Sequence, residues 1–203
     1  MFFASDAFGM VVLDDQTTTC TPGSIASTQS LDSPGFDSEA ADDILVPAGQ
    51  PWLVKQVFAS GSYFDVKAQS VNITFFADAS GVPGDPVDGC AYNDITTFTD
   101  ASGILTIDLP TPCALQGGSL GTTYWLGVQP VTGTGAAFGI WYWSENSVQH
   151  GDVAQWENPN GGFHQGCATW GDRTTCAQDT NPDQCFSVSG DIDTIFANGF
   201  EGS

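Results

Sequence analysis

The stretch Ile104-Leu-Thr-Ile-Asp-Leu109 alternates apolar and polar residues, and this alternation decides the fold class. In an extended chain it places Leu105, Ile107 and Leu109 on one face and the polar residues between them on the other. Such a pattern is typical of a β-strand with one buried and one solvated face. Comparable strand-like runs occupy 8–13, 43–46, 52–60, 71–77, 123–129, 138–143, 153–157, 186–189 and 192–196.

The composition of the 203-residue chain favours the same fold class. Hydrophobic residues make up 41% and charged residues only 13%, and 14 Phe and 6 Trp supply material for a core. Strand and turn formers are abundant, whereas Glu, Lys and Arg are scarce. We predict an all-β protein, an antiparallel β-sandwich of jelly-roll or immunoglobulin-like type. We expect residues 1–41 to form an N-terminal strand and a polar linker or loop, and residues 42–203 to form the sandwich.

The chain is strongly acidic, with 24 Asp and Glu against 3 Lys and Arg and a formal net charge of -21. A surface of this charge repels nucleic acids and anionic membranes, so neither is an expected partner. Because most of the acids are Asp, which serves turns and Ca²⁺ loops, we expect Ca²⁺ as a cofactor. A saline habitat would produce the same acidity. The candidate ligands, which cluster in turn-like sequence, are Asp78, Asp85, Asp88, Asp191 and Asp193.

Six cysteines occur, and none falls in a CxxC pair. We therefore expect three disulfides rather than a zinc site, and an oxidising compartment. Fifteen connectivities are possible in principle. Proximity in the sequence favours Cys90–Cys113 and Cys167–Cys176, which leaves Cys20 to pair with Cys185. We expect a mature secreted protein whose signal peptide has been removed, without a segment that inserts into a membrane.

A short repeat predicts two turns. Phe76-Ala-Asp-Ala-Ser-Gly81 and Phe98-Thr-Asp-Ala-Ser-Gly103 each follow an apolar stretch and end in Gly. The Asp of each copy is expected to cap backbone N–H groups while the Gly adopts a positive φ. The alternative is that Asp78 or Asp100 ligates Ca²⁺.

The stretch Asp42-Asp-Ile-Leu-Val-Pro-Ala-Gly-Gln-Pro-Trp52 resembles a recurrent β-sandwich module of secreted bacterial proteins. The resemblance continues through Val71-Asn-Ile-Thr-Phe-Phe-Ala-Asp78, Tyr124-Trp-Leu126 and Asn158-Pro-Asn-Gly-Gly-Phe163. It implies a fold and an extracellular or cell-surface location, with no catalytic residues to carry over. The ending, Asp193-Thr-Ile-Phe-Ala-Asn-Gly-Phe-Glu201, is similar to a carboxy-terminal tail of secreted proteins of Gram-negative bacteria, and is either a final strand or a sorting tag.

Aromatic residues offer a candidate ligand-binding surface. In a strand through Phe138-Gly-Ile-Trp-Tyr-Trp143, the two Trp side chains share one face. An exposed face of this kind would stack against sugar rings, as in a carbohydrate-binding module for extracellular polysaccharide. The alternative is that the rings belong to the core. The residues that we nominate are Trp125, Trp141, Trp143 and Trp156.

Candidates for catalysis are few. Glu145 and Glu157 both lie close to aromatic residues, and as a pair they would fit a glycoside hydrolase if they met across a cleft. His150 and His164 stand in loop contexts, and a metal site built on them would need a carboxylate such as Asp152. We expect that the protein is not an enzyme, with glycoside hydrolysis as the third hypothesis.

The apolar segment 2–13 is followed by a polar stretch from 14 to 41. An apolar strand on a flexible connection is what strand exchange between subunits requires, although an ordinary first strand has the same sequence. We therefore expect an extracellular structural or interaction protein that self-assembles through this strand. Carbohydrate binding is the first alternative.

Overall fold

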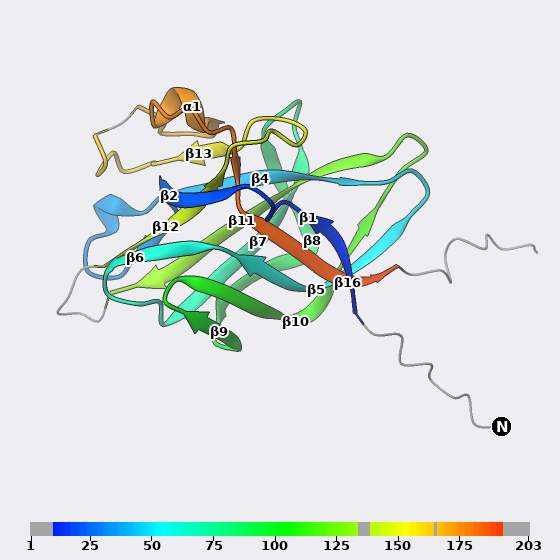
Figure 1. Cartoon of the computed structure of the whole chain (residues 1–203), viewed down its shortest axis with the longest axis horizontal. Helices are drawn as coiled ribbons and strands as arrows, with labels where there is room; N and C mark the ends of the chain where they lie inside the picture. The colour runs from blue at the N-terminus through cyan, green and yellow to red at the C-terminus, as the bar shows by residue number, and fades with distance from the viewer. Residues whose placement is uncertain (1–9, 134–138, 165, 193–203) are drawn as a thin grey trace, which may run out of the picture.

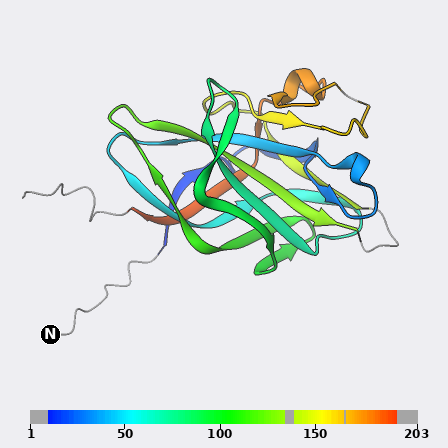
Figure 2. The ribbon, with the colours of Figure 1, turned by 180° about the vertical axis from the view of Figure 1, so that it is seen from behind.

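The structure is a computed structural model that describes residues 10–133, 139–164 and 166–192. These residues form antiparallel sheets packed as sandwich-like layers, which Figures 1 and 2 show from opposite sides. The predicted fold class, an all-β antiparallel sandwich with disulfides, is confirmed. Within the described residues, no helix is long and apolar enough to cross a membrane.

The first sheet has five strands in the order β1-β16-β5-β10-β9. Their bounds are β1 Val11–Asp15, β16 Phe186–Ile192, β5 Pro51–Ala59, β10 Ile104–Gln116 and β9 Phe98–Ala101. The strand predicted from the alternation at 104–109 is present as β10, where Leu105 and Ile107 are fully buried. β1 and β9 are the two edges of this sheet in the described part of the chain.

The second sheet has the order β14-β13-β4-β11-β7-β8, and β3 also pairs with β11. Their bounds are β14 Gly171–Asp172, β13 Gln155–Glu157, β4 Glu39–Val46, β11 Thr122–Thr132, β7 Ser70–Asp78, β8 Pro83–Ile95 and β3 Gln29–Ser30. β11 lies at the centre, between β4 and β7, and its pairing with both is antiparallel.

A smaller third sheet is built around β12 (Gly139–Asn146), which pairs with β2 (Cys20–Ala26), β6 (Gly61–Asp65) and β15 (Asp183–Gln184). β6 follows β5 after one residue, so a single extended segment runs from the first sheet into the third. The short helix α1 (Arg173–Cys176) lies against β13 and β14 (Figure 1), and a single 3-10 turn spans Pro34–Phe36.

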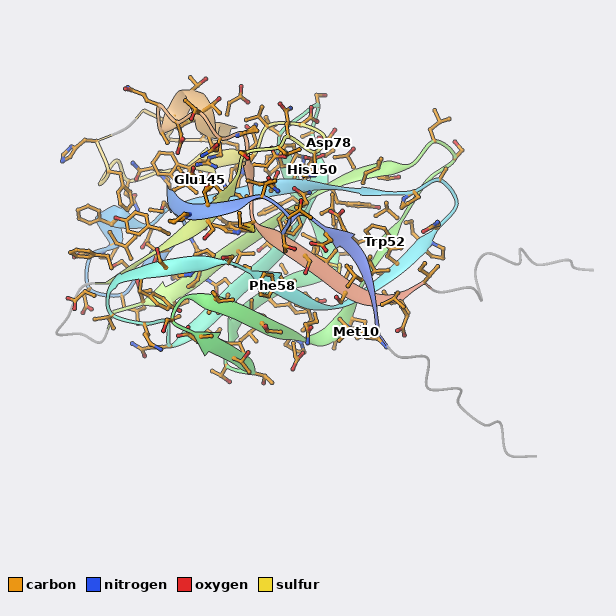
Figure 3. The ribbon with its side chains drawn as sticks, viewed as in Figure 1. Met10, Trp52, Phe58, Asp78, Glu145 and His150 are labelled. Atoms are coloured by element: carbon orange, nitrogen blue, oxygen red, sulfur yellow. A yellow bond between two sulfur atoms is a disulfide. The ribbon has the colours of Figure 1, made fainter. Side chains whose placement is uncertain are left out.

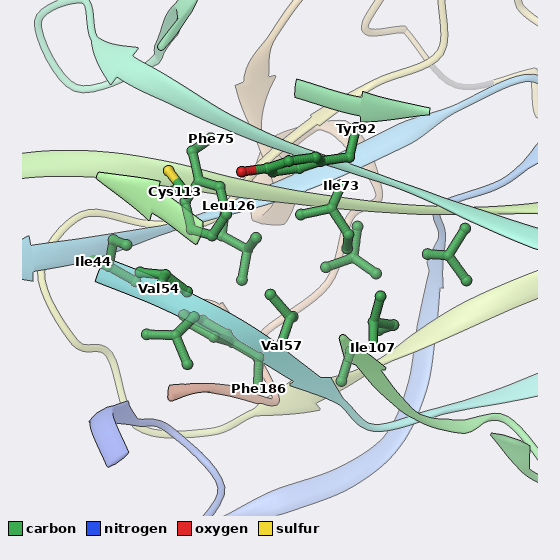
Figure 4. Packing of buried hydrophobic residues seen from close by; sticks show 14 of the residues in the cluster. Ile44, Val54, Val57, Ile73, Phe75, Tyr92, Ile107, Cys113, Leu126 and Phe186 are labelled. Carbon is green, nitrogen blue, oxygen red and sulfur yellow. The ribbon is translucent and has the colours of Figure 1, made fainter. Parts of the chain in front are cut away.

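The core lies between the first and second sheets (Figure 4). Val57 and Phe186 of the first sheet and Ile73 and Leu126 of the second are all fully buried. Each such side chain contributes about 1.5–3 kcal/mol to folding through the burial of apolar surface. A second, smaller cluster of Ala41, Phe76 and Trp125, with Trp170 packed against it, gathers apart from this core.

Residues 1–41 were expected to be a strand followed by a polar linker or loop, and the described part of this segment belongs to the sheets. β1 pairs with β16, β2 with β12 and β3 with β11. Some polar side chains of this segment are buried and paired: Ser27 Oγ donates to Val128 O at 2.5 Å, and Ser38 Oγ donates to Ala26 O at 3.0 Å. Others, such as Thr18 and Thr21, are exposed. At Ser27 and Ser38, the polar composition therefore reflects satisfied interior hydrogen bonds rather than a solvated loop. Residues 1–9 lie outside the described residues.

Three disulfides join Cys20 to Cys185, Cys90 to Cys113 and Cys167 to Cys176. This is the pairing that proximity in the sequence favoured. The disulfides indicate that the protein folds and works in an oxidising environment.

Candidate functional site

The four nominated tryptophans are buried, so the predicted exposed stacking face is wrong for the described chain. The side chains of Trp125, Trp141 and Trp143 are 0% exposed and that of Trp156 is 1% exposed. Each indole N–H has a partner within the protein; Trp143 Nε1, for example, donates to Cys185 O at 3.0 Å. Trp141 and Trp143 do share a face, as the alternation predicted, but that face is the core.

The nominated aspartates do not come together as a Ca²⁺ site. Asp78 ends β7, Asp85 and Asp88 lie in β8, and Asp191 lies in β16 of the other large sheet, where it pairs with Lys55 at 2.5 Å. Asp193 lies outside the described residues. Among the residues that the structure describes, no group of three or more His, Cys, Asp and Glu could hold a metal ion.

The repeated Asp residues cap turns, as one of the two interpretations predicted. Asp78 accepts hydrogen bonds from Ser80 N and Gly81 N at 3.1 and 3.0 Å, and Asp100 accepts one from Gly103 N at 2.7 Å. Gly81 and Gly103 both have a positive φ, at 85° and 100°. Asp78 also accepts the indole N–H of Trp125 at 3.0 Å, so its carboxylate is occupied by the protein.

Glu145 and Glu157, the hydrolase candidates, have separate partners. Glu145 is buried and pairs with the guanidinium of Arg173 at 3.0 Å. Glu157 lies directly opposite Glu39 in the β13–β4 ladder. Burial and the charge of Glu157 raise the pKa of Glu39 to about 8, and burial raises the pKa of Glu157. The carboxyl that meets Glu157 is therefore Glu39, which the sequence analysis did not nominate.

The two histidines stand apart. His164 is exposed, in a turn with φ of 56°. Figure 3 shows Met10 at the start of β1 and His150 near the other end of the strand. The Nδ1 of His150 lies 3.7 Å from Asp183 Oδ2. The backbone N–H of His150 donates to the same carboxylate oxygen.

Five carboxyl groups interact with one another beside His150, and we call them the carboxyl cluster: Asp14, Asp42, Asp43, Asp152 and Asp183. Asp42 and Asp183 are fully buried and Asp43 is 5% exposed. Asp42 accepts hydrogen bonds from Gln184 N at 2.6 Å and from Asp43 N at 2.9 Å, and Asp43 accepts one from Asp152 N at 3.1 Å. These contacts draw β1, β4, β15 and the loop at 147–154 into one polar junction.

The backbone of the loop allows this close approach. Gly151 has a φ of 81°, and a Cβ at this position would collide with the Asp43 carboxylate. Only glycine fits a position that combines a left-handed backbone with contact against a buried carboxylate. The loop therefore closes directly over Asp43.

Four members of the carboxyl cluster, Asp14, Asp42, Asp43 and Asp183, hold protons more tightly than free carboxylates do. Burial, together with the charges of Asp152, Asp183 and Asp14, raises the pKa of Asp43 to about 7, against a lowering hydrogen bond from Asp152 N. Burial raises the pKa of Asp183 to about 6 and that of Asp42 well above its usual range. Burial also raises the pKa of Asp14. The cluster can therefore take up and release protons close to neutral pH.

The main members of this cluster are not among the site residues predicted from the sequence. Asp42 and Asp43 begin the stretch 42–52 that resembles the bacterial module. The sequence feature that could have identified them is the presence of two adjacent acids within a strand whose other residues are mostly apolar. Asp183 carried no comparable signal, because its importance arises only from contacts between segments far apart in the sequence.

The second feature of the candidate site is the edge strand β1. Its only partner among the described strands is β16, and the register shifts between Val12 and Asp14. Val11 and Val12 are 47% and 62% exposed, and Met10, just before the strand, is 46% exposed. Of the four apolar residues 10–13, only Leu13 packs against the core. β1 is thus a short edge strand that buries little apolar surface in its own chain.

Comparison with protein-family models, with curated proteins and with solved structures found no match to this chain.

Proposed function

We propose that this protein is an extracellular structural module that associates with further copies of itself by exchanging its N-terminal strand β1. The observation that carries the proposal is the edge position of β1 together with the exposure of Met10, Val11 and Val12. An edge strand with exposed apolar side chains is a template for pairing between chains. Because these side chains bury little in their own chain, β1 loses little apolar contact when it leaves.

The tether after β1 suits such an exchange. Cys20 follows β1 by five residues and is bonded to Cys185, which directly precedes the partner strand β16. When β1 leaves, the disulfide keeps the connecting segment beside the vacated edge of β16. The same β16 edge then receives β1 of a second copy, and the β1–β16 ladder forms between chains instead of within one.

The charge of the chain sets the conditions for association. Copies with a formal net charge of -21 repel each other, and this repulsion falls as salt shortens the screening length to about 10 Å at 0.1 M. Association is therefore expected to increase with ionic strength. Divalent cations such as Ca²⁺ would strengthen it beyond monovalent salt of equal ionic strength if they bridge acidic surfaces.

The extracellular location rests on the three disulfides and on the resemblance to modules of secreted bacterial proteins. Carbohydrate binding through tryptophan is not supported by a comparable observation, because all four nominated rings are buried.

The decisive experiment is cross-linking across the β1–β16 ladder. Val12 and Ser189 are direct partners in this register, so Val12→Cys with Ser189→Cys forms a disulfide wherever β1 pairs with β16. In an exchanged assembly, the oxidised variant gives covalent dimers and larger species on a non-reducing gel. The matched control is Gln56→Cys with Asp108→Cys in the β5–β10 ladder, which must link within one chain.

Light scattering on the size-exclusion peak completes the test. The proposal predicts multimers that increase with salt and disappear on deletion of residues 1–13. If the Val12/Ser189 variant links only within chains, and the wild-type protein is a monomer at every salt concentration, strand exchange is excluded.

A further inference from the structure

The residue that follows β1 fixes the strand to the carboxyl cluster. Gln16 is 2% exposed, and its Nε2 donates to Asp43 O at 3.0 Å and to Asp14 Oδ2 at 3.3 Å. Its backbone N–H donates to Phe186 O at 2.9 Å, and its own carbonyl accepts a hydrogen bond from Asn146 Nδ2 at 2.8 Å. Gln16 therefore holds the end of β1 through several hydrogen bonds, one of them to the backbone of Asp43 and one to the carboxylate of Asp14.

The charged groups around Asp43 come from every element that packs there. They are Asp14 on β1, Asp42 on β4, His150 and Asp152 on the loop, Asp183 on β15 and Arg173 on α1, with Asp15 beside Asp14. Arg173 is already paired with Glu145 and Asp179, both at 3.0 Å. When all the carboxyl groups of the cluster are ionised, an excess of negative charge therefore remains at the end of β1 that carries Asp14.

Two buried oxygens in this junction lack a donor. Gln16 Oε1 and Asp183 Oδ1 are inaccessible and have no hydrogen-bond partner within the described residues. Leaving a buried acceptor without a partner carries the full desolvation penalty of that group. A proton bound by a carboxyl of the cluster adds an O–H donor among these acceptors, so the protonated cluster is better satisfied than the ionised one.

We infer that the carboxyl cluster is a pH-sensitive latch, which holds β1 in its own chain when protonated and releases β1 for exchange when ionised. The inference rests on the proposed function, because it concerns the control of the strand that is proposed to exchange. Asp14 moves with β1, whereas Asp42, Asp43, Asp152 and Asp183 stay with the sandwich. Repulsion between these two sides grows with each proton lost.

The direction of the effect follows from the raised pKa values of the cluster. The folded, latched state binds more protons than the state in which β1 is released into water, so rising pH favours release. The change is expected between about pH 4, where a solvated Asp titrates, and about pH 7, where Asp43 titrates in the latched state.

The experiment is amide hydrogen exchange on the full chain, kept monomeric at low ionic strength so that released β1 cannot pair with a second copy, and read by mass spectrometry on peptides that cover residues 10–16. Their protection is compared with that of β5 in the same sample, after correction for the intrinsic pH dependence of exchange. From pH 5 to pH 8, we expect protection of β1 to fall roughly tenfold or more relative to β5. Light scattering at the same two pH values reports the oligomeric state.

Two variants test the cause. Asp43→Asn keeps the acceptor for Asp152 N but cannot ionise, and it should reduce the pH-dependent loss of β1 protection to less than about threefold. Asp183→Asn is the second variant and should act in the same direction. The matched control is Asp88→Asn, which removes an equal charge from an exposed position on β8 and should behave as the wild-type protein does.

The outcomes separate the latch from the proposed function. If β1 protection is the same at pH 5 and pH 8 in the monomeric wild-type protein at low ionic strength, the latch is excluded. If β1 loses protection at pH 8 but the protein stays a monomer at every salt concentration, the latch stands and strand exchange fails. If Asp88→Asn abolishes the pH dependence as Asp43→Asn does, general surface charge is the cause and the latch is overturned.

Discussion

The guanidinium of Arg173 lies 3.0 Å from Glu145 Oε1, and the Arg173 side chain is fully buried. Its Nη2 also lies 3.0 Å from Asp179 Oδ2, and its Nη1 donates to Asp183 O at 2.9 Å. One cation thus joins β12, the segment before β15, and β15 itself. The chain has only three Lys and Arg residues against 24 Asp and Glu. One of these three, Arg173, is buried beside the carboxyl cluster, where buried negative charge is densest.

Replacement of this cation should be costly. Arg173→Met leaves Glu145 buried without its charge partner, and we expect the free energy of unfolding to fall by about 3–5 kcal/mol. Chemical denaturation measures the change. The control is Lys55→Met, which breaks the partly exposed pair with Asp191 and should cost no more than about 1 kcal/mol. Equal losses in the two variants would contradict the structural role of Arg173.

The stability of the protein should fall as pH rises. The pKa of Asp43 is about 7 and that of Asp183 about 6, so the folded state binds more protons than the unfolded state in this window. The free energy of unfolding should therefore decrease from about pH 4 to about pH 7, by on the order of 2 kcal/mol. Urea titrations at several pH values test this, and Asp43→Asn should flatten the profile. A rise in stability over the same interval would refute the assignment.

The Gly127 position should tolerate alanine only when Glu39 is shortened. A Cβ at Gly127 would collide with the Glu39 carboxyl and lie 3.0 Å from Phe76 Cε2. We expect Gly127→Ala to destabilise the protein by about 1–3 kcal/mol through overpacking. The double variant with Glu39→Ala should recover a large part of this loss, which thermal unfolding can follow. Additive losses in the double variant would show that Glu39 is not the obstacle.

The Cys20–Cys185 disulfide should contribute more to stability than Cys167–Cys176. The first closes a sequence separation of 165 residues and the second a separation of 9. In the chain-entropy description, the difference is about 2.5 kcal/mol in favour of the longer loop. Paired Cys→Ser substitutions at each bridge, compared by denaturation, measure it. A larger loss at the shorter loop would mean that local packing outweighs chain entropy.

The strands with strong alternation could be predicted from the sequence, and β10 and β7 lie where the pattern indicated. Proximity of the cysteines was also enough for the disulfides. The polar segment through β2 and β3 could not be predicted, because Ser27 and Ser38 are buried by hydrogen bonds to Val128 and Ala26, residues of other strands. Tertiary pairing overrides a polar composition in such cases.

The candidate site shows the same limit. Alternation predicts which tryptophans share a strand face, but it does not predict whether a later segment of the chain covers that face. Trp170 is an example, because it packs against Phe76 in the cluster that contains Trp125. The carboxyl cluster depends on contacts such as that between Asp43 and Asp152, and no local pattern predicts a contact between residues so far apart in the sequence.

The bond between Cys20 and Cys185 also decides how the described chain carries mechanical tension. The start of β1 lies beside the end of β16, so a pull on both ends breaks their ladder from the open end, one pair at a time. Peeling stops at the disulfide, which then carries the load directly from one end to the other. Everything between Cys20 and Cys185, which includes most of the core, stays outside the path of the force. Such a protein yields a short length of chain under load and then holds.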